Sequence, residues 1–576
     1  MAIDTEFVKG DPRFTELLSV IIADSERAWA VAPSLLPTLA SSLRARKLIF
    51  LQDYNHCDTI ILLKNGVDLR ETNCHNLIDI HHLLDENANH DLGSRVQEVF
   101  NDDYKRLFWN TYKNYEDAPE EEALEYACKD AIYTYRLGIQ DYETIENGPD
   151  TPDLWQLYQH VRQLSASLLD TQLNGVRVNV KLMQDTKDSM YKEISGYHET
   201  LREEFNDYCE IWEMQEWEKQ ISKRTSDSGK LRVPRPCFSF SSDRQVAWLV
   251  YEALGLPVIN KTKTGNPSTD FETLQTLSEG ERRLERLVRF KDIKSTYSTF
   301  VEGMLERVKD GRIYPDFNVS VTNTGRISHS NPNMGNLPKT GVIRNFFIPN
   351  PGMCFIGADY SQIEVVVEAN LTEDPQLLKI INEGKSKHDI TAEGLGIDRN
   401  AAKTLNFALQ YGAGVDKVRK ILGVSRDEAE DIYKRYWELY SGVSALKEKV
   451  NKEIQETGQI TNLAGRTRHF PQTQNKFELF KQQRQAYNFL IQGVAAEACN
   501  RAFYLFANWL KKNAEGRALF SVHDEILCEV YQQDPQRPYW LMQELVDTME
   551  SVSKDFNFKY PLKAVAYGPL DKWSKE

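Results

Sequence analysis

The stretch LFSVHDEILCEV, residues 519–530, combines the pattern of a buried β-strand with a polar interruption at its centre. The leucine, phenylalanine, valine and isoleucine side chains on both sides favour a half-buried strand. Asp524 and Glu525 break that pattern, because burying a carboxylate costs several kcal/mol unless it is paired or bound to a cation. The sequence therefore predicts two short strands joined by a turn, with the acids facing a cleft.

The length and composition of the chain indicate a globular protein of two to four domains. Its 576 residues exceed what one core supports, and 41% hydrophobic residues are ample for packing. The eight cysteines are scattered without a CxxC pair, as is typical of free thiols in a reducing compartment. We find no signal-peptide pattern and no apolar run of about 18 residues. We therefore expect a cytoplasmic protein, in the host cytoplasm if the source is viral, with no membrane partner.

The net charge of −15 is concentrated in the first quarter of the chain. Residues 1–150 contain 14 Lys+Arg and 28 Asp+Glu, a balance of −14, which leaves −1 for the remainder. Two basic stretches, 222–235 and 289–297, could contact phosphates although the whole chain is acidic. The alternative for each stretch is ordinary solvated surface charge.

Changes in pattern divide the chain. The segment ENGPDTPDLW (146–155) has the glycine, prolines and aspartates of a domain boundary, and a second irregular region lies at about 222–242. Helical patterns and one strand pattern follow from periodicity; the helices are expected at 181–221, 268–310, 399–410 and 426–456, and the strand at 352–360. We expect a multidomain chain of α/β and α+β type.

The segment RNAAKTLNFALQYGAG (399–414) predicts a helix with an unusual face. Arg399, Lys403, Phe407 and Tyr411 are four residues apart, so each lies about 40° round the helix from the last and all share one side. Two cations beside two aromatic rings suit a triphosphate with a base stacked nearby. The alternative is an amphipathic helix whose cations extend to solvent.

A second acid ends an apolar strand in IGADYSQIEVVVEANL (356–371). Taken alone, Asp359 is more often a helix cap than a ligand. Together with Asp524 it would supply what two-metal phosphoryl transfer needs, namely carboxylates that hold two cations about 4 Å apart. One cation activates an oxygen and the other stabilises the leaving oxygen.

These three segments, in this order, resemble the polymerase motifs of family A DNA polymerases. DYSQIE (359–364) is similar to the first motif of that family, RxxxKxxxFxxxYG (399–412) to its fingers-helix motif and VHDE (522–525) to its third motif. One departure is Val366, where the family usually has arginine. Whatever that arginine supports is open here, although catalysis should not depend on it.

The resemblance extends over about residues 150–576. Further similar segments are TNTGRISHSNPNMGNLP (322–338), RQAYNFLIQGVAAE (484–497) and KSTY (294–297). The segments that look most like phage replicative members, with bacterial DNA polymerase I more distant, are KTLNFALQYGAG, LAGRTRHFP and FNFKYPLKAVAYGPLDKW.

The resemblance implies a right-hand polymerase domain at 151–576, with a thumb at about 186–310, a palm at about 311–395 and 476–576, and fingers at about 396–475. It implies template-directed DNA synthesis by two-metal nucleotidyl transfer, with primer–template DNA and dNTPs as partners. The implied cofactors are two Mg²⁺ ions, which Mn²⁺ can replace. A processivity factor, a helicase and a primase are further candidate partners, and 210–240 is a candidate partner surface.

The resemblance also implies roles for single residues. Asp359 and Asp524 would hold the two cations with Glu525 close by, and Lys403 would donate a proton to the leaving pyrophosphate. Glu364, helped by Tyr411, would exclude a ribose 2′-hydroxyl. The implied dNTP contacts are Arg399, Lys403, Phe407, Tyr411, His388, Glu364 and Tyr360. The implied contacts to DNA are Arg326, Arg484, Asn488, Gln492, His523 and Lys294.

The acidic first quarter carries a second set of carboxylates. Asp4 and Glu6 of MAIDTEF are two residues apart and share one face of a strand, which alone is most often a solvated face. Tyr126 and Asp130 of LEYACKDAIYTYRL (124–137) are four apart on a predicted helix. Asp58 follows an apolar strand within residues 48–66.

This second set resembles the DEDDy proofreading exonucleases that precede family A polymerase domains, and it implies an RNase H-like domain at 1–150. The DxE and YxxxD elements match, whereas NHCD (55–58) is one residue short and has Cys57 where an aromatic residue is usual. The resemblance implies 3′–5′ exonuclease activity, with two Mg²⁺ ions bound by Asp4, Glu6, Asp58 and Asp130 and the attacking water oriented by Tyr126. The alternative is a degenerate nuclease fold with a structural role, which the short strand before Asp4 favours.

Three other functions are weighed against proofreading DNA synthesis. A stand-alone exonuclease whose second half clamps duplex DNA is opposed by the intact Asp359, Lys403 and Asp524. A non-catalytic DNA-binding scaffold would have lost one of the metal carboxylates, and none is lost. An RNA-synthesising relative is opposed by Glu364.

Overall fold

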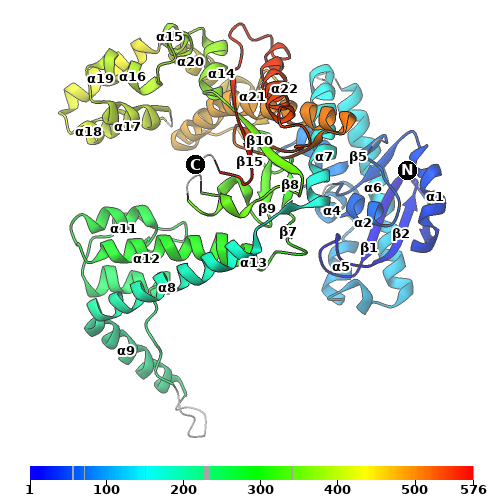
Figure 1. Ribbon diagram of the computed structural model, residues 1–576, viewed down its shortest axis with the longest axis horizontal. Helices are drawn as coiled ribbons and strands as arrows, with labels where there is room; N and C mark the ends of the chain where they lie inside the picture. Colours follow the sequence, from blue (N-terminus) through cyan, green and yellow to red (C-terminus); the bar gives the residue numbers. More distant parts are fainter. Residues whose placement is uncertain are drawn as a thin grey trace. The chain divides into compact units, whose positions relative to one another are not determined.

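The computed structural model describes residues 1–54, 57–70, 72–148, 151–224, 234–338, 341–410 and 412–574, which form two compact units. Unit 1 comprises Met1–Val176, Tyr314–Asn336 and the chain from Pro349 onward, and unit 2 comprises Arg177–Ile313 and Leu337–Ile348. Both units mix helices with short strands, as Figure 1 shows. In the ranges just given, no helix has the length and apolarity that crossing a bilayer requires.

Unit 1 begins with a five-stranded sheet in the order β3-β2-β1-β4-β5; Figure 1 labels its strands β1, β2 and β5. β1 is antiparallel to β2 and parallel to β4, and β4 is parallel to β5. The strands are β1 Ala2–Phe7, β2 Leu17–Ala23, β3 Ala28–Val31, β4 Ile49–Leu51 and β5 Cys74–Asn76. The accompanying helices are α1 Leu36–Arg44, α2 Asp58–Lys64, α3 Leu77–Leu84, α4 Leu92–Phe100, α5 Tyr104–Thr111, α6 Glu120–Asn147 and α7 Thr151–Asn174.

The two faces of β1 pack into different hydrophobic clusters. Ile3 packs with side chains of α1 and α2, whereas Ala2 packs with side chains of α6. Because successive side chains of a strand point to opposite faces, Asp4 and Glu6 share the α6 face with Ala2, and Thr5 shares the face of Ile3. The alternation predicted for MAIDTEF is therefore confirmed, and it directs both acids toward α6.

A second, four-stranded sheet in the order β13-β14-β10-β15 forms the other half of unit 1. All of its pairings are antiparallel. Its strands are β10 Met353–Tyr360, β13 Gly516–Val522, β14 Glu525–Tyr531 and β15 Ala564–Leu570. The long helix α21 Lys476–Asn513 packs on β13, and α22 Arg537–Ser551 packs on β10 and β15. The hairpin β8 Asp316–Asn318 and β9 Ser328–Ser330 also belongs to unit 1.

A helical region inserted between β10 and α21 completes unit 1. Its helices are α14 Ile363–Thr372, α15 Pro375–Glu383, α16 Lys387–Leu395, α17 Arg399–Gln410, α18 Val415–Leu422, α19 Arg426–Leu439 and α20 Ser441–Thr457. The short hairpin β11 Gln459–Thr461 and β12 Thr467–His469 follows them. A buried set of hydrogen bonds joins Thr391, Asn406, Tyr436 and Tyr440, which ties α16 and α17 to α19.

Unit 2 is mainly helical and has its own core. The helices are α8 Val180–Glu204, α9 Asn206–Arg224, α10 Asp243–Ala247, α11 Phe271–Ser278, α12 Leu284–Thr296 and α13 Gly303–Leu305, with π-helical turns at Trp248–Ala253 and Tyr297–Glu302. The short strands β6 Val176–Arg177 and β7 Arg312–Ile313 lie at its ends in the sequence. Phe205, Phe238, Phe240 and Phe290 are at the centre of the core.

Most elements predicted from the sequence are present, with shorter helices than expected. The strand at 352–360 and the helix at 399–410 are confirmed by β10 and α17. The helices expected at 181–221, 268–310 and 426–456 are each divided. The last of these divides at Tyr440, which ends α19 and precedes α20. The break near 150 and the irregular region near 230 fall partly on residues outside the described ranges.

Candidate active sites

A tight β-hairpin and the strand beside it bring two aspartates together; we call Asp359 and Asp524 the hairpin pair. His523 and Asp524 join β13 to β14, and His523 has φ of +59°, a left-handed conformation suited to a tight turn. Asp359 of β10 is opposite Glu525 of β14, and the amide of Tyr360 donates to the carbonyl of Asp524 at 3.1 Å. Both aspartates are half-buried. The turn predicted from the sequence is confirmed.

Glu525 is a buried acceptor within the sheet. Its side chain is 5% exposed, and its Oε1 accepts hydrogen bonds from the Tyr567 hydroxyl and, at 3.1 Å, from the Trp573 indole. Gly357 leaves room for the Tyr567 ring, because a Cβ there would lie 2.2 Å from the phenolic oxygen. Burial and then the Glu525 carboxylate raise the pKa of Tyr567, so the phenol stays a donor. Glu525 is therefore fixed beside Asp359 by two aromatic partners.

A cleft of about 240 Å³ opens at the turn. Its polar lining consists of His523 and Asp524 from the turn, Arg326, and the first residues of α14, which include Glu364. Arg326 donates from Nη2 to Oε1 of Glu364 at 2.6 Å, and both side chains remain partly exposed. The structure thus brings four of the predicted site residues to one cleft.

The predicted cationic face of α17 is present. Arg399, Lys403 and Phe407 are exposed, whereas Ala402, Leu405 and Leu409 on the other side are buried. The remaining member of the predicted face, residue 411, lies outside the described residues. This pattern agrees both with the predicted triphosphate-binding face and with an amphipathic helix whose cations extend to solvent.

His388 of α16 stands beside this face. Its ring centroid is 5.7 Å from that of Phe407, and its Nδ1 lies 3.2 Å from Nδ2 of Asn406. Burial, followed by the charges of Arg399 and Lys403, lowers the pKa of His388. Arg399 also donates from Nε to Oδ1 of Asp389 at 2.7 Å. The structure therefore brings His388 to the α17 face, as the sequence predicts.

The DNA contacts predicted on α21 form one row along the helix. Arg484, Asn488 and Gln492 are four residues apart and each is at least partly exposed. The Arg484 guanidinium lies 5.3 Å from the Phe480 ring centroid, and a Cβ at Gly412 would come 2.4 Å from Cδ of Arg484. Arg484 thus packs on the chain just after α17. Lys294 belongs to unit 2, where its ammonium lies 5.0 Å from the Tyr297 ring centroid.

Tyr360, predicted as a nucleotide contact, lies elsewhere. Its side chain is 3% exposed, and its hydroxyl donates to the carbonyl of Met549 in α22 at 2.8 Å. Since it follows Asp359 in the same strand, its side chain points to the opposite face of the sheet. We therefore correct this prediction: the phenol of Tyr360 packs β10 on α22.

A buried ion pair that sequence reasoning did not single out supports the loop of Arg326. Arg466 donates from Nη2 to Oε1 of Glu497 at 2.6 Å, and both side chains are almost fully buried. Gly325 has φ of +76° and lies against this pair, since a Cβ there would be 2.7 Å from Oε1 of Glu497. Asn500 also donates to the Gly325 carbonyl at 2.9 Å. Both charged residues lie in segments that resemble the polymerase family, and that resemblance was the only available signal.

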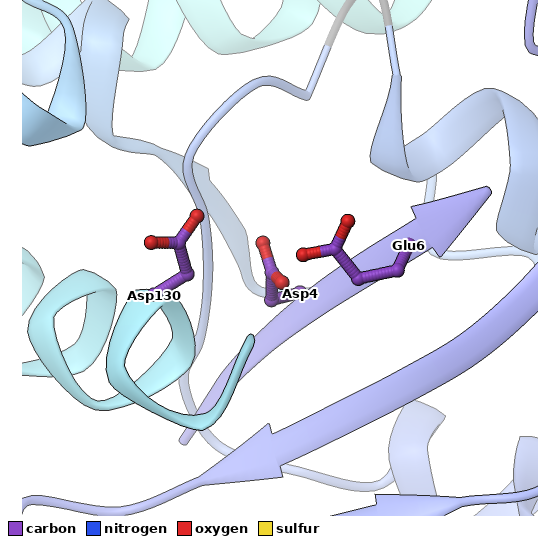
Figure 2. Close-up of side chains that lie close together, drawn as sticks. All are labelled: Asp4, Glu6 and Asp130. Atoms are coloured by element: carbon purple, nitrogen blue, oxygen red, sulfur yellow. The ribbon is translucent and has the colours of Figure 1, made fainter. Parts of the chain in front are cut away.

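The N-terminal cluster, which we define as Asp4, Glu6 and Asp130, joins β1 to α6. One carboxylate oxygen from each residue lies within 4.8 Å of those from the other two, and Figure 2 shows the three side chains turned toward one another. Burial, and then the neighbouring Glu6, raises the pKa of Asp4 well above its usual range. Burial and the nearby Asp130 raise the pKa of Glu6 to about 8. Three of the four predicted nuclease carboxylates are therefore together.

Asp58, the fourth predicted carboxylate, is not part of this group. It begins α2 and is 5% exposed, and its Oδ1 accepts a hydrogen bond from the Thr5 hydroxyl at 2.7 Å. Thr5 lies on the face of β1 opposite to Asp4 and Glu6. Burial raises the pKa of Asp58 to about 7. The residues before it, 55 and 56, belong to the shortened motif and lie outside the described ranges.

Two residues of α5 that sequence reasoning missed complete the surroundings of Asp130. The Tyr104 hydroxyl donates to Oδ1 of Asp130, and the Lys105 ammonium donates to Oδ2. Tyr126, one turn before Asp130, accepts from the Trp109 indole at 3.1 Å and stacks on Phe108 with ring centroids 4.2 Å apart. No spacing or periodicity connects residues 104 and 105 with the acids, so only tertiary packing reveals them.

The hairpin pair and the N-terminal cluster both offer carboxylate oxygens, which are the ligands that Mg²⁺ and Mn²⁺ take. In the N-terminal cluster, Oδ2 of Asp4 is buried with no hydrogen-bond partner among the described residues. A buried carboxylate oxygen is costly unless a proton or a cation meets it. At the turn, half-buried Asp524 precedes Glu525, and half-buried Asp359 pairs with Glu525 from β10. The residues therefore fit cations at both places.

The site combines an acidic strand and turn, a cleft lined by Asp524, and a helix, α17, that presents cations. The model of DNA polymerase family A matches residues 210–575, and the chain belongs to that family. Similar curated relatives include DNA polymerase I of Pseudomonas aeruginosa, 33% identical over 51% of this chain and 34% of the relative. DNA polymerase I of Bacillus subtilis is 28% identical over 78% of this chain and 49% of the relative. The chain thus spans a third to a half of these relatives.

A solved structure shares the fold over nearly the whole chain. It is described as the POL domain of Pol1 from M. smegmatis in complex with DNA primer–template and dNTP. The two align with a TM-score of 0.79 and 20% sequence identity, covering 99% of this chain and 95% of that one. The likeness therefore includes the five-stranded sheet as well as the region that the family model matches.

Proposed function

We propose that the chain is a DNA-dependent DNA polymerase of the phage replicative type with a 3′–5′ proofreading exonuclease at residues 1–150. In this proposal the four-stranded sheet belongs to the palm at about 311–395 and 476–576, the helices α17 to α20 belong to the fingers at about 396–475, and the thumb comprises about residues 186–310. The partners are primer–template DNA and dNTPs.

One observation carries the polymerase half of the proposal: Asp359 and Asp524, 165 residues apart in the sequence, occupy neighbouring positions, because Asp359 of β10 pairs with Glu525 and the Tyr360 amide donates to the carbonyl of Asp524. Asp524 also lines the cleft. A lone strand-end aspartate would be a helix cap or a solvated residue. Two neighbouring aspartates within the segment matched by the family model supply the carboxylates that two-cation nucleotidyl transfer needs.

The residues of the chain would share the work of the reaction. Cations bound by the hairpin pair would lower the pKa of the primer 3′-hydroxyl and neutralise charge on the phosphates. Arg399 and Lys403 would bind the triphosphate, and Lys403 would donate a proton to the departing pyrophosphate oxygen. Glu364 would occupy the space that a ribose 2′-hydroxyl needs, with Arg326 fixing its carboxylate.

Two further groups would position the reactants. Glu525 would orient the hairpin through Tyr567 and Trp573, so we regard it as a positioning residue. Arg484, Asn488 and Gln492 on α21 would contact the minor groove, where the acceptors of correct base pairs are alike. His523 lines the cleft next to Asp524 and would contact the primer.

The exonuclease half is supported by the convergence of Asp4, Glu6 and Asp130 and by the buried, unsatisfied oxygen of Asp4. A cation bound there would activate a water for attack on the terminal phosphodiester. Tyr126 would orient that water. Asp58 lies near enough to contribute to the raised pKa of Asp4, and it would join the cluster when a cation and substrate bind.

Primer extension tests the polymerase proposal. The protein, a primed template and Mg²⁺ are incubated with the four dNTPs, and in a parallel reaction with the four rNTPs. We expect templated extension with dNTPs and little with rNTPs. Absence of dNTP incorporation would refute the proposal, and equal use of both would refute the role of Glu364.

Degradation of a mispaired 3′ end tests the exonuclease proposal. In the absence of dNTPs, we expect stepwise removal of nucleotides from the 3′ end with Mg²⁺ and none with EDTA. Failure to remove the mispaired nucleotide under any cation would support the alternative of a degenerate nuclease fold.

A further inference from the structure

Both carboxylate oxygens of Asp130 are engaged by donors from the start of α5. The Tyr104 hydroxyl donates to Oδ1 and the Lys105 ammonium donates to Oδ2. The Asp130 side chain is 6% exposed, and that of Lys105 is 29% exposed. A member of the N-terminal cluster is therefore already paired with a positive charge that belongs to the chain.

The rest of the fold fixes this arrangement. The start of α5 is tied to α6, because Oδ1 of Asp102 accepts from the Tyr104 amide at 3.0 Å and its Oδ2 accepts from the Tyr133 hydroxyl at 2.7 Å. The stem of Lys105 runs past Gly93 of α4, where a Cβ would come 3.2 Å from Cδ of the lysine. The ammonium lies 5.3 Å from the Tyr126 ring centroid. These contacts position the start of α5, the aliphatic part of the Lys105 side chain and its ammonium group.

The charge of Lys105 reaches the whole cluster. It counteracts the pKa increases that burial and mutual repulsion impose on Asp4 and on Glu6. Desolvation opposes the ammonium form of Lys105, yet Asp130 and Tyr126 outweigh it and raise the lysine pKa. The hydrogen bond to Oδ2 of Asp130 thus places the Lys105 ammonium beside the three carboxylates of the cluster.

We infer that Lys105 is a built-in cation of the N-terminal cluster that competes with a divalent cation for Asp130. While Lys105 holds Asp130, a divalent cation would have only Asp4 and Glu6 of the cluster as ligands. A cation that bound all three carboxylates would require the ammonium to leave Oδ2. The inference rests on the proposed exonuclease only for its effect on catalysis, since the competition itself concerns cation binding.

The displaced side chain has a place to go. A groove of about 740 Å³ lies between α4 and α5, and its lining includes Gly93, Gln97, Lys105, Arg106 and Trp109. Lys105 therefore borders both the cluster and an open groove. Rotation about its side-chain bonds would move the ammonium from Asp130 to solvent without any movement of the backbone.

The neighbouring Arg106 offers a matched control. It also lines the groove, but its guanidinium pairs with Asp103 and its side chain is 72% exposed. Replacing Arg106 removes one positive charge from the same helix without removing the partner of Asp130. A difference between the two variants isolates the contact with the cluster from the general charge of α5.

The test is Mn²⁺ binding by isothermal titration calorimetry on the full chain. Every variant also carries Asp524→Asn, which weakens Mn²⁺ binding by the hairpin pair. We expect Lys105→Met to bind Mn²⁺ about tenfold more tightly or to take up one additional ion, because a charge next to a carboxylate shifts its affinity for a cation by about that factor or more. We expect Arg106→Met to bind Mn²⁺ with the affinity of the parent. Adding Asp4→Ala to Lys105→Met should abolish the tight Mn²⁺ binding.

A second measurement guards against misfolding. In EDTA, Lys105→Met should unfold at a lower temperature than Arg106→Met, and Mn²⁺ should remove this difference. Lys105→Arg, which keeps the charge, should retain the weak binding of the parent. The inference is wrong if Lys105→Met binds Mn²⁺ like the parent, or if its loss of stability is not reversed by Mn²⁺.

The outcomes separate this inference from the proposed exonuclease. If the parent chain degrades 3′ ends but Lys105→Met leaves Mn²⁺ binding unchanged, the inference fails and the exonuclease stands. If Lys105→Met tightens Mn²⁺ binding in a chain that never degrades DNA, the built-in cation stands and the exonuclease fails.

Discussion

The two acidic places in unit 1 hold their carboxylates in different ways. The hairpin pair lies at a strand end and a turn, half-buried beside a cleft, and the third acid there, Glu525, is satisfied by two aromatic donors. In the N-terminal cluster, one oxygen from each of three carboxylates lies within 4.8 Å of the other two, and the Lys105 ammonium donates to one of these carboxylates.

This difference has an energetic consequence. Carboxylates that share a buried place repel one another and lose hydration, so they need protons or cations to be stable. Half-buried aspartates at a turn are partly hydrated, so their stability depends less on protons or cations. We therefore expect the cluster to depend on cations for its stability and the hairpin pair to depend on them mainly for its chemistry. The predictions below test that contrast.

The largest expected effect is on the hairpin pair. Asp524→Asn should reduce the rate of primer extension by at least about 10³-fold, because cation-bound carboxylates contribute several kcal/mol of transition-state stabilisation. Unfolding temperature and 3′-end degradation should stay close to the parent. Single-turnover extension measures the loss, and Asp534→Asn, an exposed acid beyond β14, is the control. A loss below tenfold would contradict a cation-binding role.

The next effect is on the N-terminal cluster. Asp4→Ala should reduce removal of a mispaired 3′ nucleotide by about 10²–10³-fold and leave extension of a matched primer intact. Glu26→Gln, an exposed acid between β2 and β3, serves as the control. Degradation that survives Asp4→Ala would show that the activity, if present, resides elsewhere.

Selection of the sugar should change by less. Glu364→Ala should reduce the preference for dNTPs over rNTPs by about 10–100-fold, since an apolar or open space rejects an added hydroxyl poorly. It also frees Arg326 from its 2.6 Å ion pair. The ratio of kcat/KM for dATP and ATP measures this change, and Glu373→Ala, an exposed acid after α14, should leave the ratio unchanged.

Glu525 distinguishes positioning from cation binding within the hairpin. Glu525→Gln keeps an oxygen that accepts from Tyr567 and Trp573, so extension should fall by less than about tenfold. Pre-steady-state extension compares this variant with Asp524→Asn. Equal losses would show that Glu525 acts as a cation ligand and that the contrast between the two acids is wrong.

The pH dependence of stability should be the smallest effect and should come from the cluster. The pKa of Glu6 is raised from 4.5 to about 8, so the folded protein holds a proton that the unfolded chain releases. Its contribution to stability is complete below about pH 4.5 and is lost as the pH rises to about 8. In EDTA the unfolding temperature should therefore be lower at pH 8.5 than at pH 6.5, and Glu6→Gln should flatten this change. A higher unfolding temperature at pH 8.5 would contradict the buried cluster.

The sequence predicted the positions of acids where local periodicity controls them. Asp524 interrupts an apolar pattern, so a turn follows from the cost of burying it. Asp4 and Glu6 alternate on β1, and the exposed residues of α17 follow from the helical repeat. Strand alternation also explains why Tyr360 points to the opposite face from Asp359, although the family resemblance implied a nucleotide contact.

The rest depends on tertiary packing that no local pattern encodes. Lys105 reaches Asp130 because α5 packs on α6, and Arg466 meets Glu497 because a hairpin loop folds onto α21. Asp58 accepts a hydrogen bond from Thr5 on the other face of β1. The shortened motif around Asp58 did not predict this contact. The helix expected at 268–310 is interrupted between Ser278 and Leu284, with a turn at residues 279–280.

The central claim is that Asp359 and Asp524 act as one unit in a single cleft, and a double-mutant cycle tests it most directly. Single-turnover primer extension is measured for the parent, Asp359→Asn, Asp524→Asn and the double variant. Residues that hold the same cations are grossly non-additive, so we predict that the double variant is about as slow as the slower single variant. Losses that multiply in the double variant would contradict the claim, because they would mean that the two aspartates act independently.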